Sequence, residues 1–195
     1  MAANALAETT GPLIPVGLSM GGIVALDILR QAPGRVTAVA LFDTDCGADT
    51  LARRRNRDAQ ILMAVHGDFL KMVDTQLLPN YFSTNTEHET KTLQLLGDTV
   101  KTMAINLGVA RLAAQFSALA TRKDSWPMLE TIIVPVLIAC GSEDRICTPD
   151  SHLKMASVVL SATLECIEGA GHLSPLEQPT QTTRVLRSWL ATLKY

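Results

Sequence analysis

Three continuous apolar runs of strand length constrain the fold most strongly: LIPVG at 13–17, VTAVALF at 36–42 and IIVPVLIAC at 132–140. A strand that is apolar along its whole length is typical of a parallel sheet covered by helices on both faces. A fourth run, ATLECIE at 162–168, also predicts a strand. Because helical patterns separate these runs, the sequence predicts an α/β architecture with a mostly parallel sheet.

The segments around the runs predict helices. We expect helices at residues 2–8 and 20–32, a helix that begins at Pro149 with Thr148 as its N-cap, and a last helix with Trp189 on its apolar face. Pro-Gly or Gly-Pro pairs follow the first two, as is common after a helix end.

The segment between Asp49 and Asp124 has no strand pattern. Thr86 and Glu89 predict a capping box at the start of a helix within it. Apolar residues recur there at helical spacing in two stripes: Ile61, Val65, Phe69 and Val73, then Leu93, Leu96, Val100, Met103 and Leu107. We therefore expect an all-helical insertion between the second and third strands.

Charge and composition exclude several classes of partner. The chain has 17 Lys and Arg against 19 Asp and Glu, so it has no cationic excess for nucleic acid or for an anionic membrane surface. No apolar stretch approaches the roughly 20 residues of a membrane-spanning helix, and the N-terminus has no signal-peptide pattern. We expect a cytoplasmic protein that binds neither nucleic acid nor membrane.

The cysteines indicate no metal site. Cys46, Cys140, Cys147 and Cys166 form no CxxC pair and have no histidine at metal-ligand spacing. We interpret all four as buried free thiols. Since no nucleotide or flavin motif is present either, we expect no cofactor and no metal.

Residues Gly17-Leu18-Ser19-Met20-Gly21 match G-x-S-x-G, the nucleophile elbow. The match lies between an apolar strand and a buried helix, which is the context that the motif requires. In that context the start of the helix directs the Met20 N–H toward a developing oxyanion. The alternative interpretation is a glycine-rich turn that only packs a helix against a strand.

A serine nucleophile needs a base to accept its proton. His172, in EGAGHLSPLEQP, is the only histidine that follows a predicted strand end, and we expect it to be that base. We expect His66, His88 and His152, which lie in helical or helix-leading stretches, to be exposed.

The base in turn needs an acid that orients it. Asp144, in CGSEDRICTPD, is one candidate, because it follows the third strand and sites are built at the carboxyl ends of parallel strands. Glu143, Asp150 and Asp43 remain as alternatives, and Asp43 is among them because it directly follows the second strand.

The order Ser19, Asp144, His172, in the motifs GLSMGG, GSEDRICTP and GAGHLSPLEQP, resembles the α/β-hydrolase fold family. The resemblance covers nearly the whole chain and implies the C-terminal part of that fold, a mostly parallel sheet with flanking helices and a helical cap insertion. It divides the chain into a nucleophile-elbow part at 1–45, the cap at 46–125, and the core part with the acid and base loops at 126–195.

Intact members of this family begin with about four more strands and a loop that supplies a second oxyanion N–H. Only twelve residues precede Leu13, so we expect an N-terminally truncated chain. Its strand at 13–17 would be an unpaired edge, through which two copies could form a homodimer. Only the Met20 N–H would then face an oxyanion.

The resemblance implies a serine hydrolase that cleaves a small-molecule ester or lactone through an acyl-enzyme. Ser19 would attack the carbonyl, His172 would be the base, Asp144 would orient it, and Met20 N–H would form the oxyanion hole. Esterase or lactonase activity is the closest expectation, with thioesterase, carbon–carbon hydrolase and cofactor-free haloperoxidase activity open. The alternative is a catalytically impaired remnant or scaffold that lacks the oxyanion loop.

Overall fold

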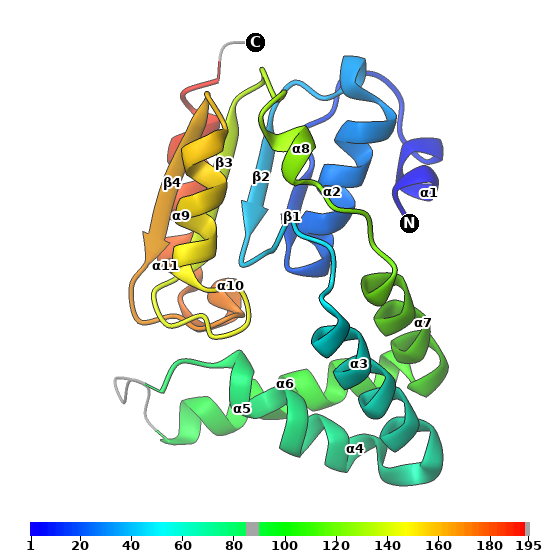
Figure 1. Ribbon diagram of the computed structural model, residues 1–195. Coiled ribbons are helices and arrows are strands. Elements are labelled where there is room, and N and C mark those ends of the chain that lie inside the picture. The colour runs from blue at the N-terminus through cyan, green and yellow to red at the C-terminus, as the bar shows by residue number, and fades with distance from the viewer. Residues whose placement is uncertain (85–89, 194–195) are drawn as a thin grey trace.

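The computed structural model describes residues 1–84 and 90–193, without the side chains of residues 90 and 91. Its sheet has four parallel strands in the order β1-β2-β3-β4. The strands are β1 (Val16–Leu18), β2 (Val39–Phe42), β3 (Val136–Gly141) and β4 (Ala162–Ile167). The predicted α/β architecture with a parallel sheet is therefore confirmed (Figure 1).

Alternating side chains of the strands are buried on opposite faces of the sheet. Val39 and Leu41 of β2 pack into one apolar core, and Ala40 and Phe42 pack into the other. This two-sided burial explains why the central strands are apolar at every position. Helices α2 (Met20–Gln31), α8 (Trp126–Leu129) and α9 (Pro149–Val158) contribute side chains to the core on the first face. Helix α11 (Pro179–Leu190) contributes side chains to the core on the second face.

Three smaller elements complete this part of the chain. Helix α1 (Ala2–Ala7) packs against α2, and a short helix, α10 (Ser174–Glu177), precedes α11. A 3-10 turn at Pro33–Arg35 connects α2 to the segment before β2. Strand β1 begins at Val16, three residues later than predicted, because Leu13 forms only an isolated bridge with Val36.

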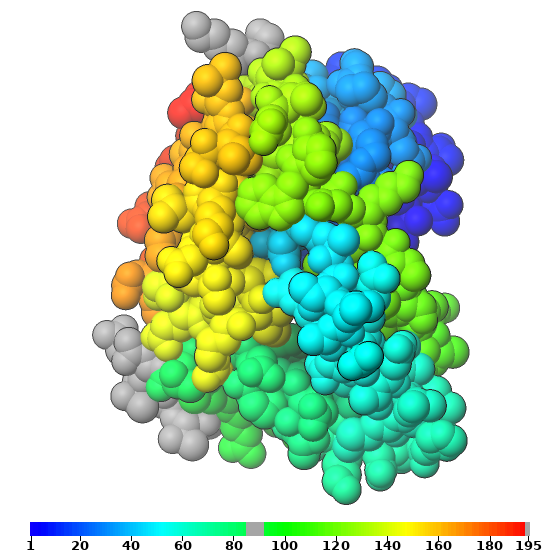
Figure 2. Space-filling model, in the orientation of Figure 1, coloured from blue at the N-terminus to red at the C-terminus, as the bar shows by residue number. Residues whose placement is uncertain are grey.

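A helical insertion lies between β2 and β3 and packs across the carboxyl ends of the strands (Figures 1 and 2). We use this name for helices α3 (Leu51–Met63), α4 (Phe69–Met72), α5 (Leu78–Tyr81), α6 (Thr90–Leu107) and α7 (Val109–Ala120) with the π-helical turns Ala64–Asp68 and Val73–Leu77. Its apolar core is separate from those of the sheet and includes Met72, Val73, Leu112 and Phe116.

The two predicted apolar stripes of the insertion are only partly buried. Val65 is 57% exposed and Met103 is 60% exposed, whereas Val73 and Val100 are buried. The first stripe fails because the chain turns at Gly67, with φ of 101°, and the π-helical turns change the angular spacing of the side chains. The predicted capping box of Thr86 and Glu89 lies outside the described residues.

The cysteine prediction is correct for three residues and wrong for the fourth. Cys46, Cys140 and Cys147 are buried free thiols, but Cys166 is exposed. Cys166 lies on β4, which is the last strand of the sheet within the described residues.

In the described part of the chain no single helix is long and apolar enough to cross a membrane. Residues Thr92–Leu107 and Val109–Ala120 reach the required length and composition only as a pair that is bent by 96°.

Candidate active site

Ser19 occupies a sharp turn between β1 and α2. Its φ of 52° is unusual for a residue with a side chain, and its backbone N–H donates to the carbonyl of Phe42 at 2.8 Å. A Cβ at Gly17 would lie 2.2 Å from the carbonyl oxygen of Gly21, so the turn requires glycine at that position. The sequence motif therefore folds as the strand-to-helix elbow that presents a serine hydroxyl at the end of a strand.

His172 connects the Ser19 hydroxyl to a carboxylate. Its Nε2 lies 2.8 Å from Ser19 Oγ, and its Nδ1 lies 2.9 Å from Asp144 Oδ2. Since an ionised carboxylate can only accept, Nδ1 carries the proton and Nε2 faces the serine hydroxyl as an acceptor. The structure thus brings together the three residues that the sequence pointed to, from three different strand ends.

Asp144 is held in place by the loop that carries it. Its Oδ1 accepts hydrogen bonds from the backbone N–H groups of Ile146 at 2.8 Å and Cys147 at 3.0 Å, which leaves Oδ2 for His172. Asp144 is 2% exposed and His172 is 3% exposed. Asp144 and His172 are therefore a buried, oriented pair.

The alternative acids lie in other environments. Asp43 is fully buried and accepts hydrogen bonds from Gly141 N–H at 2.8 Å and Ser174 Oγ at 2.5 Å, not from His172. Burial raises the pKa of Asp43 from 3.8 to about 7, although both hydrogen bonds act in the opposite direction. Glu143 accepts from Thr84 N–H at 3.1 Å, and Asp150 is exposed in the first turn of α9.

The other histidines include one wrong prediction. His66 is exposed as expected, and His88 lies outside the described residues. His152, expected to be exposed, is fully buried: Thr44 N–H donates to its Nε2 at 3.1 Å, and its Nδ1 lies 3.0 Å from the Thr148 carbonyl. Burial lowers the pKa of His152, so the neutral ring forms part of the support beneath the site.

The Met20 N–H begins α2 directly after Ser19. It donates to no acceptor among the described residues, as is usual for the first N–H groups of a helix. Together with the positive end of the α2 dipole, it can stabilise negative charge that develops next to Ser19 Oγ.

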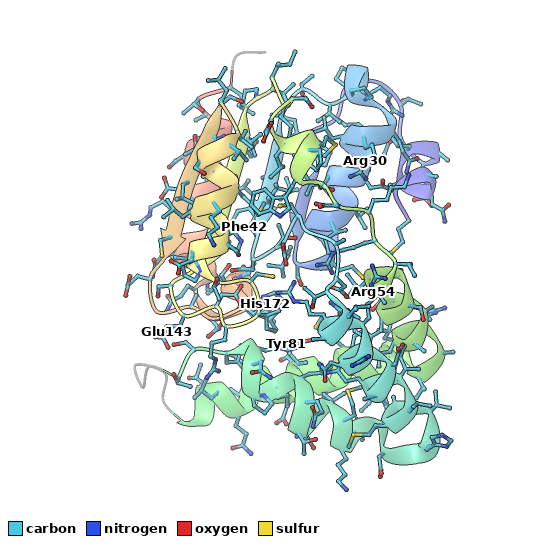
Figure 3. All side chains as sticks on the ribbon, in the orientation of Figure 1. Arg30, Phe42, Arg54, Tyr81, Glu143 and His172 are labelled. Carbon is cyan, nitrogen blue, oxygen red and sulfur yellow. The ribbon has the colours of Figure 1, made fainter. Side chains whose placement is uncertain are left out.

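Helix α5 of the helical insertion is hydrogen-bonded directly to the loop that carries His172, a contact that the sequence pattern did not reveal. The Tyr81 carbonyl accepts from the N–H groups of His172 at 2.8 Å and Leu173 at 3.3 Å. The Tyr81 ring stacks on the His172 ring, with 5.8 Å between centroids (Figure 3). Gly171 allows this approach, since a Cβ there would lie 2.7 Å from the Phe82 backbone.

A cavity of about 360 Å³ lies between the strand ends and the helical insertion, and Ser19 and His172 form part of its wall. Helix α3 contributes a polar face to it, and Phe116 and Leu119 of α7 contribute an apolar part. Its size is in the range of cavities that bind small molecules.

The sequence matches the model of the alpha/beta hydrolase family over residues 2–185. The chain belongs to the alpha/beta hydrolase family. A curated protein of Bacillus subtilis (strain 168), provisionally named 2-succinyl-6-hydroxy-2,4-cyclohexadiene-1-carboxylate synthase, is 25% identical over 91% of this chain. The chain spans 65% of the length of that protein.

Two solved structures illustrate the similarity of this alpha/beta hydrolase to others. A malate-bound thermophilic esterase from Thermogutta terrifontis is 27% identical and superposes with a TM-score of 0.86, covering 97% of this chain and 68% of the esterase. The enol-lactonase from Burkholderia xenovorans LB400 is 20% identical, with a TM-score of 0.83, and the match covers 97% of this chain and 70% of the lactonase. The second similarity concerns the fold alone.

The cavity of this alpha/beta hydrolase contains a network of ion pairs. Asp49 pairs with Arg57 at 2.5 Å and with Arg122 at 2.7 Å, and Asp45 pairs with Arg53 and, at 3.6 Å, with Arg122. Three guanidinium groups thus share two carboxylates. The Arg57 guanidinium also lies 5.7 Å from the centroid of the Phe116 ring.

One cluster in the described residues has the side chains that could hold a metal ion. The ligand atoms of Asp144, Cys147 and His172 lie within 4.8 Å of one another. Asp144 and His172 already bond to each other, and burial raises the pKa of the Cys147 thiol, whereas a metal would need the thiolate. The arrangement therefore suits proton transfer to and from Ser19 better than metal binding.

Proposed function

We propose that this alpha/beta hydrolase is a serine hydrolase that cleaves small-molecule esters or lactones through an acyl-enzyme. The observation that carries the proposal is the hydrogen-bonded chain from Ser19 Oγ through His172 to Asp144, at 2.8 Å and 2.9 Å. This chain has the geometry in which an imidazole can activate a serine hydroxyl.

In the acylation step, His172 Nε2 accepts the Ser19 proton as Oγ attacks the substrate carbonyl. The carbonyl oxygen becomes an oxyanion next to the Met20 N–H, and Asp144 stabilises the positive imidazolium. The tetrahedral intermediate then breaks its bond to the leaving alcohol oxygen, which receives the proton from His172. Ser19 is left as an ester of the acyl group.

In the deacylation step, His172 accepts a proton from a water molecule that attacks the acyl-enzyme carbonyl. The second tetrahedral intermediate breaks its bond to Ser19 Oγ, and the proton on His172 returns to that oxygen. The carboxylic acid product is released. In a lactone the leaving alcohol stays attached to the acyl group, so the product is a single hydroxy acid.

The similarity to an esterase at 27% identity supports ester cleavage as the reaction class. A serine at the elbow, where an aspartate would be the nucleophile of other hydrolytic chemistries, supports the acyl-enzyme. The competing proposal is a catalytically impaired remnant or scaffold that keeps these three residues without turnover.

The experiment that separates the two proposals is intact-mass measurement after incubation with a fluorophosphonate probe. We expect a single adduct on the parent protein and none on Ser19→Ala, with circular dichroism spectra that show both proteins folded. The matched control is Ser157→Ala, which removes an exposed hydroxyl of α9 and should leave the adduct unchanged. A folded parent that forms no adduct would refute the serine hydrolase and support the remnant.

A further inference from the structure

Arg145 is a cation in the cavity wall that has no acidic partner among the described residues. It directly follows Asp144 and lines the same cavity as Ser19 and His172. Its Nη2 donates to the carbonyls of Pro79 at 2.6 Å and Phe82 at 2.9 Å. Among the described residues its Nε and Nη1 have no hydrogen-bond acceptor, and its guanidinium forms no ion pair.

The two carbonyl bonds fix the orientation of this guanidinium. Both hydrogens of Nη2 are used by the protein, so the three hydrogens on Nε and Nη1 are available to a ligand. A planar guanidinium with free donors fits a carboxylate, and it is held in place before the ligand arrives. Pre-orientation of this kind lowers the entropic cost of binding.

Gln60 of α3 is a second group in the cavity wall whose side chain has no partner in the described part of the chain. It is 8% exposed and lines the cavity, yet its side-chain amide makes no hydrogen bond to the described residues. A buried amide without a partner destabilises a folded protein, so its presence indicates a ligand that supplies the missing bond.

The charge of the cavity wall favours an anion. Its described residues include four arginines, Arg53, Arg57, Arg122 and Arg145, and one aspartate, Asp45. Even with Asp49 counted as the partner of Arg57 and Arg122, positive charge remains in excess. Because the cavity is partly screened from water, this excess attracts an anion more strongly than an open surface would.

We propose that the substrate carries a carboxylate in addition to its ester or lactone group, that Arg145 binds this carboxylate, and that Gln60 hydrogen-bonds a polar group of the same molecule. The cleavage of such a substrate rests on the proposed function, whereas the binding of its carboxylate by Arg145 does not. It assigns Arg145 to substrate selection, in contrast to the bond-breaking roles of Ser19 and His172.

The test compares release of 4-nitrophenol from two esters, mono-4-nitrophenyl glutarate and its methyl ester, in which a methyl group removes the negative charge. In the parent protein we expect kcat/KM to be higher for the charged ester. In Arg145→Gln the ratio of the two kcat/KM values should fall by about 10- to 100-fold, which is the range for a lost hydrogen bond to a charged group. Arg145→Lys should keep part of the preference.

The ratio separates substrate binding from structural support. If Arg145 served only to hold α5 through Pro79 and Phe82, its replacement would slow both esters equally and leave the ratio unchanged, which would overturn the proposal. The control Arg187→Gln, on α11 outside this cavity, should leave both rates unchanged. Gln60→Leu should raise the melting temperature and lower kcat/KM, because it removes an unpaired amide that a ligand uses.

Binding of glutarate, measured by calorimetry at low salt, distinguishes the two possible failures. If neither ester is cleaved but glutarate binds the parent at least about tenfold more tightly than Arg145→Gln, the hydrolase proposal fails and the carboxylate site stands. If esters are cleaved without a charge preference, or glutarate binds both proteins equally or neither, the carboxylate site is refuted.

Discussion

Asp43 should make the free energy of unfolding of the parent protein decrease as the pH rises. Replacement of Asp43 by asparagine should abolish this decrease. The Asp43 carboxyl is fully buried directly after β2, and burial raises its pKa from 3.8 to about 7. Asparagine fits the same place, because its Oδ1 can accept from Gly141 N–H and its Nδ2 can donate to Ser174 Oγ.

The direction of the effect follows from proton binding. Between about pH 4 and about pH 7 the folded state keeps a proton on Asp43 that the unfolded state has released, so the contribution of Asp43 to stability decreases as the pH rises through this window. Since one pKa unit corresponds to about 1.4 kcal/mol, ionisation of Asp43 costs about 4 kcal/mol of folding free energy by about pH 8.

Urea unfolding followed by circular dichroism measures this cost. From about pH 5 to about pH 8, the unfolding free energy of Asp43→Asn should rise by about 3 kcal/mol relative to that of the parent. The buried His152 is present in both proteins, so its opposite pH dependence cancels in the difference. The control Asp150→Asn, at an exposed position of α9, should show no such change. Parallel curves for the parent and Asp43→Asn would refute this reasoning.

Three further predictions concern the site and the sheet. Asp144→Asn should lower the kcat of ester cleavage by about 10⁴-fold with little change in KM, because the orientation and charge balance of His172 are lost; a loss below about tenfold would contradict the assigned role. Gly17→Ala should lower the unfolding free energy by about 3 kcal/mol or more, because its Cβ would overlap the Gly21 carbonyl, whereas Gly21→Ala, with open space around its Cβ, should not destabilise α2; equal urea midpoints would contradict this. We also expect a homodimer through the edge of β1, where Val16 is 51% exposed, and Val16→Lys should convert it to a monomer by light scattering after gel filtration; a monomeric parent would contradict the expectation.

The sheet and its covering helices were predictable from the sequence because they depend on local patterns. The runs at 36–42 and 132–140 are apolar at nearly every position, which is typical of a strand covered on both faces. The alignment of Ser19, Asp144 and His172 was predictable for a related reason. In a parallel sheet the carboxyl ends of the strands share one edge, so residues that follow different strands converge there.

The features that the sequence did not reveal depend on contacts between distant segments. His152 lies in an ordinary helical pattern, but its burial depends on Thr44, 108 residues away. Asp43 could be placed after a strand, but its raised pKa results from burial, which outweighs the opposing hydrogen bonds from Ser174 and Gly141. The break at Gly67 was also missed, because a single glycine does not distinguish a continuous helix from one that turns.

The hydrogen bonds at Tyr81 limit how independently the helical insertion and the loop after β4 can evolve. Because the Tyr81 carbonyl accepts from the His172 N–H, the segment that bounds the cavity also positions the imidazole that would transfer the proton in the proposed reaction. A mutation that reshapes α5 to admit a larger substrate would also displace the imidazole. A change of substrate specificity through α5 would therefore require compensating substitutions in the loop after β4. New specificity should arise more readily through α3 and α7, which have no such bond to His172 among the described residues.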